Sequence, residues 1–377
     1  MAGRIYVVAG ELSGDAHGAG LLRVLERLCP GVKIAGVGGP AMAAVAGVGV
    51  RDWVGDAAVV GLWEVVKHYP WFKARFEEML AEVRALRPEV LLLIDYPGFN
   101  LRFSAAVRRE FPEVRQVYYI APQVWAWNQR RVPKMVELLD EMLCLLPFEE
   151  PIFTAAGLKT QFVGHPLVDE LAGQRDAAVA RDEDLVGLFP GSREREVERL
   201  FPVMLEAARR LTGWRAALRF EAPAASERLG GRMREMVRLA KAGDFLKVTL
   251  GGSHALMQRA GCGVIASGTA TLEAAYFGLP YCLTYKVAWP TYLAGRLLVK
   301  LKHIGLVNIL AGEEVVEEFI QGEAEPGRLA AAVRQMLEEP ARREALQRRL
   351  AETVAMLGGE GAHQRAAAAV AGWMRHG

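Results

Sequence analysis

The carboxylate of Asp95 follows directly after an apolar run and precedes a turn, a placement that suits proton transfer. The five residues from Val90 to Ile94 are all aliphatic and predict a strand buried on both faces of a parallel sheet. Tyr96-Pro97-Gly98 then predicts a turn. Ligands bind at the carboxyl ends of such strands, and partial burial there raises the pKa of a carboxylate. Asp95 is therefore a candidate general base, with capping of the next helix as the alternative.

A second polar group follows the first strand of the chain. Ile5 to Ala9 predicts that strand, and a helix through about Leu28 follows the glycine-rich turn. This layout presents backbone N–H groups to an anion or a sugar, but the glycine spacing is not that of a dinucleotide site. Four polar side chains in the turn suit recognition of sugar hydroxyls: Glu11, Ser13, Asp15 and His17. The alternative is that Ser13 or Asp15 caps the helix.

A third turn, Pro190-Gly191-Ser192-Arg193, lies between a predicted strand and a predicted helix in the second half of the chain. Gly191 lets the backbone approach a ligand, Ser192 supplies a hydroxyl, and Arg193 supplies a planar cation that fits phosphate. The alternative is a helix cap in which Arg193 pairs with Glu196 or Glu198. Phosphate contact is the interpretation that we prefer.

A fourth turn, Ser267-Gly268-Thr269, places small residues and hydroxyls at another predicted helix start, which suits an anion. Glu273 follows one helical turn after Thr269 and is placed to accept hydrogen bonds from the two hydroxyls of a ribose. Two phosphate-binding turns in one half predict a nucleotide with a diphosphate. Neither turn is a Walker motif, which disfavours ATP hydrolysis.

These turns are joined by strands that alternate with helices along both halves of the chain. The pattern predicts an α/β protein of two facing Rossmann-like domains with a cleft between them. The predicted strands after the first are 33–37, 90–94, 114–120, 141–146 and 160–163, then 185–189, 216–221, 245–250, 263–266 and 281–285.

The turn Gly164-His165-Pro166 marks the end of the first domain, so we predict domains over residues 1–167 and 168–359. The tail from about residue 360 to 377 is predicted to be helical and to pack back on the first domain. Asp182-Glu183-Asp184 resembles a metal-binding DxD motif, but it precedes a strand, and we interpret it as a solvated linker.

Composition describes a well-packed globular protein. The chain has 377 residues, of which 52% are hydrophobic and 24% charged, with a net charge of +2 that gives no sign of nucleic-acid binding. Its four cysteines show no metal-binding spacing and are typical of a reducing compartment. We expect no signal peptide and no transmembrane helix, and hence a cytoplasmic protein.

Two segments combine basic and aromatic residues. No acidic residue occurs from Ala274 to Gly312, a stretch that is rich in cations, aromatics and leucines. This composition favours contact with anionic lipid, at about 1 kcal/mol per basic residue, with a basic helix over a diphosphate site as the alternative. The second segment, from Val59 to Leu80, is also interpreted as a lipid contact, with core packing as the alternative. The candidate membrane or acyl-chain contacts are Trp63, Val66, Trp71, Phe72, Trp289, Lys286, Arg296, Lys300 and Lys302.

Six motifs, spread in order over most of the chain, resemble those of the lipid-A-disaccharide synthase family, whose architecture is called GT-B. They are Gly10-Glu11-Leu12-Ser13-Gly14-Asp15, Ile94-Asp95-Tyr96-Pro97-Gly98-Phe99-Asn100-Leu101-Arg102, Pro122-Gln123-Val124-Trp125-Ala126-Trp127, Phe162-Val163-Gly164-His165-Pro166, Pro190-Gly191-Ser192-Arg193 and Ala266-Ser267-Gly268-Thr269-Ala270-Thr271-Leu272-Glu273. The family's Leu-Pro-Asn is Leu306-Val307-Asn308 here, and its Pro-Glu is Glu317-Glu318, before Gln321. Both departures replace a proline.

The resemblance implies an inverting glycosyltransferase of lipid A biosynthesis that needs no metal or other cofactor. It would transfer 2,3-diacylglucosamine from UDP to the 6-hydroxyl of 2,3-diacylglucosamine 1-phosphate (lipid X), giving a β-1,6 disaccharide phosphate and UDP. Asp95 would be the base, and Asn100 would join the acceptor side. Arg193, Ser267 to Thr269 and Glu273 would hold UDP, with Asn308 and Gln321 on the donor side.

Partners and location follow from the same resemblance. The expected partners are the two acylated substrates, the anionic cytoplasmic face of the inner membrane, to which the protein would bind peripherally, and a second copy in a homodimer. Two alternatives stay open: an enzyme similar to UDP-N-acetylglucosamine 2-epimerase, and a non-catalytic protein that binds lipid peripherally.

Overall fold

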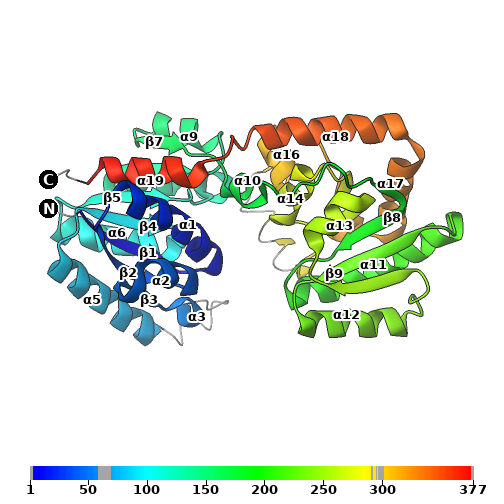
Figure 1. Ribbon diagram of the computed structural model, residues 1–377, viewed down its shortest axis with the longest axis horizontal. Helices are drawn as coiled ribbons and strands as arrows, with labels where there is room; N and C mark the ends of the chain where they lie inside the picture. The colour runs from blue at the N-terminus through cyan, green and yellow to red at the C-terminus, as the bar shows by residue number, and fades with distance from the viewer. Residues whose placement is uncertain (1–2, 58–68, 290–291, 294, 296–300, 375–377) are drawn as a thin grey trace. The chain divides into compact units, whose positions relative to one another are not determined.

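The computed structural model describes residues 3–57, 69–289, 292–293, 295 and 301–374. The chain forms two compact units, one of Met1–Asp169 with Leu357–Gly377 and one of Glu170–Met356. Each unit contains one parallel sheet with helices packed against it (Figure 1). The predicted α/β class with two Rossmann-like domains is therefore confirmed.

The first unit is built on a seven-stranded parallel sheet of order β3-β2-β1-β4-β5-β6-β7. Its strands are β1 Arg4–Ala9, β2 Lys33–Gly38, β3 Val50–Asp52, β4 Val90–Ile94, β5 Arg115–Tyr119, β6 Glu141–Cys144 and β7 Thr160–Phe162. Its helices are α1 Leu12–Leu28, α2 Pro40–Ala46, α3 Val54–Ala57, α5 Tyr69–Leu86, α6 Pro97–Glu110, α7 Val124–Trp127, α8 Val132–Leu138, α9 Glu149–Ala155 and α19 Ala362–Gly372, with α10 Pro166–Leu171 at its boundary.

Alternation along β1 explains the layers of this unit, because successive side chains of a strand point to opposite faces. Ile5 and Val7 pack in one cluster with α1 and α19. Tyr6 and Val8 pack in the other cluster, with α5 and α6. Both faces of the sheet are thus covered, and this is why the strands read as unbroken apolar runs.

The C-terminal helix α19 completes the first unit. Figure 1 shows α19, in red, beside α1, in blue. The Asp169 carboxylate accepts hydrogen bonds from the backbone N–H groups of Gly361 and Ala362, at 2.6 and 2.9 Å, where this helix begins. The Arg365 guanidinium donates to the Val163 carbonyl at 2.8 Å. These contacts hold the end of the chain against residues nearly two hundred positions earlier.

The second unit is built on a six-stranded parallel sheet of order β10-β9-β8-β11-β12-β13. Its strands are β8 Asp182–Phe189, β9 Arg219–Ala224, β10 Leu246–Leu250, β11 Ala260–Ala266, β12 Tyr281–Tyr285 and β13 Glu318–Ile320. Its helices are α11 Glu194–Trp214, α12 Glu227–Leu239, α13 Ser253–Arg259, α14 Ala270–Tyr276, α16 Leu306–Ala311, α17 Pro326–Glu338 and α18 Pro340–Ala355. The short 3₁₀ helices of the chain are Gly47–Gly49, Gln129–Arg131 and Gln321–Glu323.

Two element predictions in the second half were wrong. The strand predicted at 216–221 lies at Arg219–Ala224. Pro223 belongs to this strand, although the pairing with β8 already ends at Glu221. Asp182-Glu183-Asp184 is the start of β8 and not a linker. Each of its carboxylates pairs with an arginine elsewhere in the unit: Asp182 with Arg219, Glu183 with Arg343 and Asp184 with Arg215.

Candidate active site

The first candidate site lies where β1 and β4 end side by side. These strands are hydrogen-bonded neighbours, with Ala9 opposite Ile94, and the chain leaves them toward opposite edges of the sheet. Such a switch point is where parallel sheets bind ligands. The turns that carry Glu11 and Asp95 are therefore adjacent, and Gly10 allows this because a Cβ there would lie 2.3 Å from the Tyr96 ring.

The backbone at Asp95 is in an uncommon conformation. Asp95 and Tyr96 have φ angles of +46° and +48°, a left-handed region that few residues other than glycine adopt. The Asn100 amide donates to the Asp95 carbonyl at 2.7 Å, and the Tyr118 hydroxyl also donates to it. Asp95 N–H in turn donates to the Tyr119 carbonyl at 3.0 Å. The backbone is thus fixed on both sides, and this orients the Asp95 side chain.

The electrostatics of Asp95 suit a general base. Burial, and after it the neighbouring negative charge of Glu11, raise the pKa of its carboxyl to about 6. Hydrogen bonding to Tyr96 N–H and the proximity of His17 lower the same pKa. A carboxylate with a pKa near 6 is ionised at neutral pH and is still basic enough to accept a proton.

Two predicted acceptor-side residues, Asp15 on α1 and Asn100 on α6, are used within the first unit. The buried Asp15 carboxylate accepts hydrogen bonds from the N–H groups of Gly39, Ala41 and Met42, at 2.8–2.9 Å, and so caps α2. Asn100, also buried, uses its amide nitrogen on backbone carbonyls, including Ile94 at 3.2 Å. Direct contact of either residue with the acceptor substrate stays a prediction. In the structure both residues stabilise the backbone of the turns at this site.

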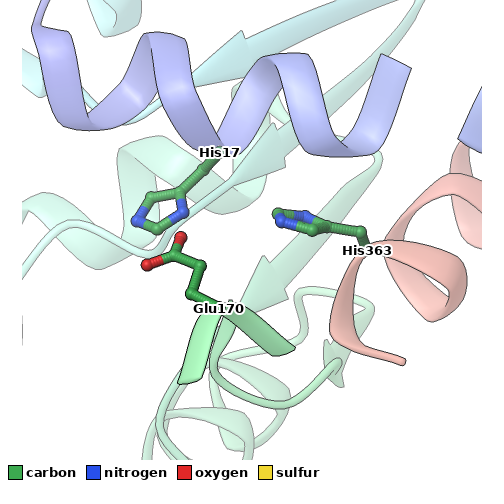
Figure 2. Close-up of side chains that lie close together, drawn as sticks. All are labelled: His17, Glu170 and His363. Carbon is green, nitrogen blue, oxygen red and sulfur yellow. The ribbon is translucent and has the colours of Figure 1, made fainter. Parts of the chain in front are cut away.

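The other three polar residues after β1 are accessible, and because α1 begins at Leu12, Ser13 and His17 lie on this helix and not in a turn. Glu11 and Ser13 are exposed, and His17 is half-buried on α1. Figure 2 shows the His17 imidazole beside that of His363 on α19, with ring centroids 6.3 Å apart. It also draws Glu170, on α10, where the second unit begins. His17 therefore borders the returning C-terminal helix, a neighbour that the sequence did not indicate.

The second candidate site is a cavity of about 360 Å³ within the second unit. It lies where β8 and β11 end side by side, with Phe189 opposite Ile265. The strand order reverses here as well, so the position matches that of the first site. The structure brings together in its lining the two turns predicted to bind phosphate and the glutamate predicted to bind ribose: Gly191, Ser192, Arg193, Ser267, Gly268, Thr269 and Glu273.

The helix cap considered as the alternative for Arg193 is present, and its contact with phosphate stays a prediction. Arg193 is the N-cap residue of α11, its guanidinium lies 3.1 Å from the Glu196 carboxylate, and its side chain is 83% exposed. An ion pair this exposed contributes little free energy, so the guanidinium can exchange it for a bound phosphate. Gly191, at φ +104°, provides the left-handed turn before it, where a Cβ would lie 2.4 Å from Glu196 Oε2.

Glu273 is half-buried on α14, and its carboxylate lies beside a histidine. Its Oε2 is 3.3 Å from His254 Nε2, on α13. On the same side of the cavity, Ser267 N–H donates to the Thr284 carbonyl at 3.0 Å, and the Thr271 hydroxyl donates to the Gly268 carbonyl at 2.7 Å. These bonds fix the turn between β11 and α14.

Asn308 and Gln321, predicted on the donor side, are buried and hold backbone. The Asn308 oxygen accepts from the N–H groups of Val315 and Val316, and its nitrogen donates to the Val316 carbonyl and to Glu318. The Gln321 side chain exchanges two hydrogen bonds with the backbone of Val287, at 2.7 and 3.1 Å. Direct contact with the donor stays a prediction for both.

The candidate lipid contacts differ between the two segments. Trp71 and Phe72 are half-buried, and Trp71 stacks on the buried Trp53 at 5.7 Å, as the core-packing alternative expects. Trp289 is 61% exposed and Lys302 is exposed, whereas Lys286 donates to the Ala324 carbonyl at 3.1 Å. The remaining four lie outside the described residues: Trp63, Val66, Arg296 and Lys300. Within the described part of the chain, no helix is long and apolar enough to cross a bilayer.

Sequence reasoning missed two residues that contact the candidate site residues, and a buried carboxylate beside a motif tryptophan. Tyr118 donates to the Asp95 carbonyl, and His254 approaches Glu273. Glu149, whose pKa burial raises to about 7, accepts a hydrogen bond from the indole of Trp125 at 3.0 Å. Trp125 is therefore buried, with its indole N–H paired. Tyr118 carried a signal, since it lies on the strand next to β4; the other two pairs depend on tertiary contacts alone.

Solved structures with the same fold include a co-structure with UDP and a glycotransferase. S. aureus MnaA, in its co-structure with UDP, is 13% identical and covers 96% of this chain and 94% of its own, with a TM-score of 0.61. The glycotransferase of kitacinnamycin is 17% identical over 99% of both chains, with a TM-score of 0.59. At these identities the similarity establishes the fold alone.

Curated relatives are much more similar in sequence. The lipid-A-disaccharide synthases of Trichlorobacter lovleyi and Geobacter sulfurreducens are each 40% identical to this chain, over 97% of it and 96% of their own length. A family model described as lipid-A-disaccharide synthetase matches residues 5–371. The match takes in both sheets, both switch points and the C-terminal helix. The chain therefore belongs to the lipid-A-disaccharide synthase family of glycosyltransferases.

Proposed function

We propose that the chain transfers 2,3-diacylglucosamine from its UDP donor to the 6-hydroxyl of 2,3-diacylglucosamine 1-phosphate, a step of lipid A biosynthesis. The products are the β-1,6-linked disaccharide 1-phosphate and UDP. Family membership supports the reaction class. The observation that carries the assignment of roles is the cavity of the second unit, where Arg193, Ser267 to Thr269 and Glu273 line one space.

In this proposal the second unit holds the donor. Arg193 and the turn from Ser267 to Thr269 bind the diphosphate, and Glu273 accepts hydrogen bonds from the ribose hydroxyls. As the bond between the anomeric carbon and the diphosphate oxygen breaks, negative charge accumulates on UDP. Cationic and N–H donors already aimed at that charge stabilise the transition state. We therefore propose that no metal ion is needed for the leaving group.

The first unit supplies the base. Asp95 removes the proton of the acceptor 6-hydroxyl while that oxygen attacks the anomeric carbon from the side opposite the leaving diphosphate. One C–O bond forms, one breaks, and the configuration inverts. The φ angle of +46° and the two hydrogen bonds to the Asp95 carbonyl support this role, because strained and well-fixed backbone is typical of catalytic positions.

Both substrates carry acyl chains, so we propose that the protein works at the cytoplasmic face of the inner membrane as a peripheral protein. We also propose that it forms a homodimer. The exposed Trp289 and Leu293 and the cation of Lys302 support a lipid contact. The test of the contact is sedimentation with anionic vesicles. Binding should weaken as salt rises and in Trp289→Ala, and salt-independent binding would argue against an electrostatic contribution.

The test of the reaction is an assay with UDP-2,3-diacylglucosamine and lipid X, read by mass spectrometry. The expected product is the disaccharide phosphate, with one UDP released per linkage. UDP-N-acetylglucosamine, which lacks the acyl chains, is the matched control and should be left unchanged. Conversion of that control to an epimer, or failure to bind UDP at all, would contradict the proposal.

A further inference from the structure

His254 lies behind the wall of the donor cavity and touches its acidic residue. It is the second residue of α13, and its Nε2 atom is 3.3 Å from Oε2 of Glu273 on α14. Its ring lies against Phe277, with centroids 5.3 Å apart, one helical turn beyond Glu273. The imidazole therefore contacts one oxygen of the Glu273 carboxylate and leaves the other oxygen for a ligand.

The other ring nitrogen identifies where one proton lies. His254 Nδ1 is 2.9 Å from Gln174 Oε1, and Gln174 Nε2 is 2.6 Å from the Glu170 carbonyl. A carbonyl only accepts, so the amide nitrogen of Gln174 must face it and the amide oxygen must face the ring. His254 Nδ1 therefore carries a hydrogen and donates it to Gln174.

The remaining nitrogen then faces a carboxylate. A neutral ring protonated at Nδ1 would present the Nε2 lone pair to Glu273, and two acceptors would repel each other. The contact is attractive when Nε2 also carries a proton, which makes the ring an imidazolium paired with the carboxylate. The histidine thus holds Glu273 in one orientation through a charge-assisted hydrogen bond.

We propose that His254 is a positioning residue that fixes Glu273 for the ribose hydroxyls and so makes the donor site selective for ribonucleotides over 2′-deoxyribonucleotides. This inference rests on the proposed UDP site and adds a residue to it. Without His254, the Glu273 side chain is free to rotate, and the 2′-hydroxyl loses an acceptor held in place. His254 does not touch the substrate, so its effect on binding passes through Glu273.

Several other ionisable groups near α13 are paired elsewhere. On β9, Glu221 pairs with Arg259 at 2.5 Å, and Arg219 pairs with Asp182 of β8. Arg181 donates to three backbone carbonyls. The further ionisable groups on the elements packed against α13 are Glu183 and Asp184 of β8, Cys262 of β11 and Tyr276 of α14. The segment before β8 adds Arg175 and Asp176. Glu273 is the carboxylate within hydrogen-bond distance of the His254 ring among the described residues.

The test compares the affinities of UDP and 2′-deoxy-UDP by calorimetry. In the wild type we expect UDP to bind about tenfold more tightly, the usual effect of one hydrogen bond to a charged group. His254→Ala should reduce this ratio to about 1–3 and raise the donor KM, with kcat little changed. Arg193→Ala should weaken both nucleotides equally, because they carry the same diphosphate.

Two further variants separate positioning from a general loss of structure. His254→Arg keeps a cation beside Glu273 and should restore most of the ratio. In a Glu273→Gln background, His254→Ala should have little further effect.

The outcomes also separate this inference from the proposed function. If the wild type fails to bind UDP, or if Arg193→Ala leaves the affinity unchanged, the donor site itself is misplaced. If Arg193→Ala weakens binding while His254→Ala, folded by its circular dichroism spectrum, keeps the wild-type ratio, the donor site stands and the role of His254 is overturned.

Discussion

At the scale of single residues, Asp95 depends on backbone that other residues hold. Its left-handed φ angle is maintained by bonds from Asn100 and Tyr118 to its carbonyl, and its pKa is raised mainly by burial. A buried apolar run followed by an acid predicted the candidate base. It could not predict Tyr118 as a support, since that contact joins residues 23 positions apart.

Replacement of Asp95 with asparagine tests the base directly. Asn is isosteric and tolerates φ > 0, so the turn should be kept. We expect kcat to fall by roughly 10²- to 10⁴-fold, the usual range for a general base. Steady-state kinetics with both acylated substrates measures this, and UDP affinity, which belongs to the second unit, should be unchanged. Turnover near that of the wild type would remove Asp95 from the role.

The raised pKa of Asp95 also predicts a dependence of stability on pH. The folded-state pKa is about 6, above the unfolded value of about 3.9, so ionisation opposes folding as the pH rises between them. Asp95→Asn should therefore raise the unfolding free energy by about 1–2 kcal/mol at pH 8, after allowance for solvent screening, and by almost nothing at pH 4. Urea unfolding at both pH values measures the difference. An equal gain at both would assign the effect to the backbone instead.

At the scale of elements, most strands were predictable and their partners were not. Runs such as Val90–Ile94 are aliphatic throughout, because both faces of a parallel strand are buried. β3 and β13 have three residues each, too few for a pattern, and were missed. Proline is unfavourable inside a strand, so Pro223 indicates a strand end in the sequence; in the structure it lies beyond Glu221, the last residue paired with β8, and pairs with Thr249 of β10.

The capping of α2 by Asp15 shows how one side chain joins two elements. Asp15→Ala leaves three N–H groups at the start of α2 without their acceptor, two of them in buried bonds, and should cost about 2–3 kcal/mol of unfolding free energy. Asp52→Ala is the matched control. Asp52 is exposed and accepts one bond, from Val54 at 3.2 Å, so its loss should cost below about 1 kcal/mol. Equal losses in the two variants would contradict the structural role of Asp15.

At the scale of the whole molecule, the chain builds the same kind of site twice. Each unit places polar turns at the switch point of a parallel sheet, and the two turns differ in charge: Glu11 and Asp95 in the first, Arg193 with small hydroxyl residues in the second. Acidic groups suit proton removal, and a cation with hydroxyls suits a diphosphate. The division of labour between the units follows from this contrast.

That division predicts independence from divalent cations. In the proposed mechanism Arg193 and backbone donors take the charge of the leaving UDP, so activity in the presence of excess EDTA should stay within about twofold of the untreated enzyme. The assay is the same mass-spectrometric measurement of disaccharide phosphate. A strict requirement for an added divalent ion would contradict the proposed donor site, and the neighbouring imidazoles of His17 and His363 would be the first place to look for the ion (Figure 2).

The most direct test of the central claim is a crystal structure of the full chain with UDP. The account predicts the diphosphate in the second unit, between the turn of Gly191 to Arg193 and the turn of Ser267 to Thr269, with the ribose hydroxyls at Glu273. UDP bound in the first unit beside Asp95 would contradict that claim and the roles derived from it.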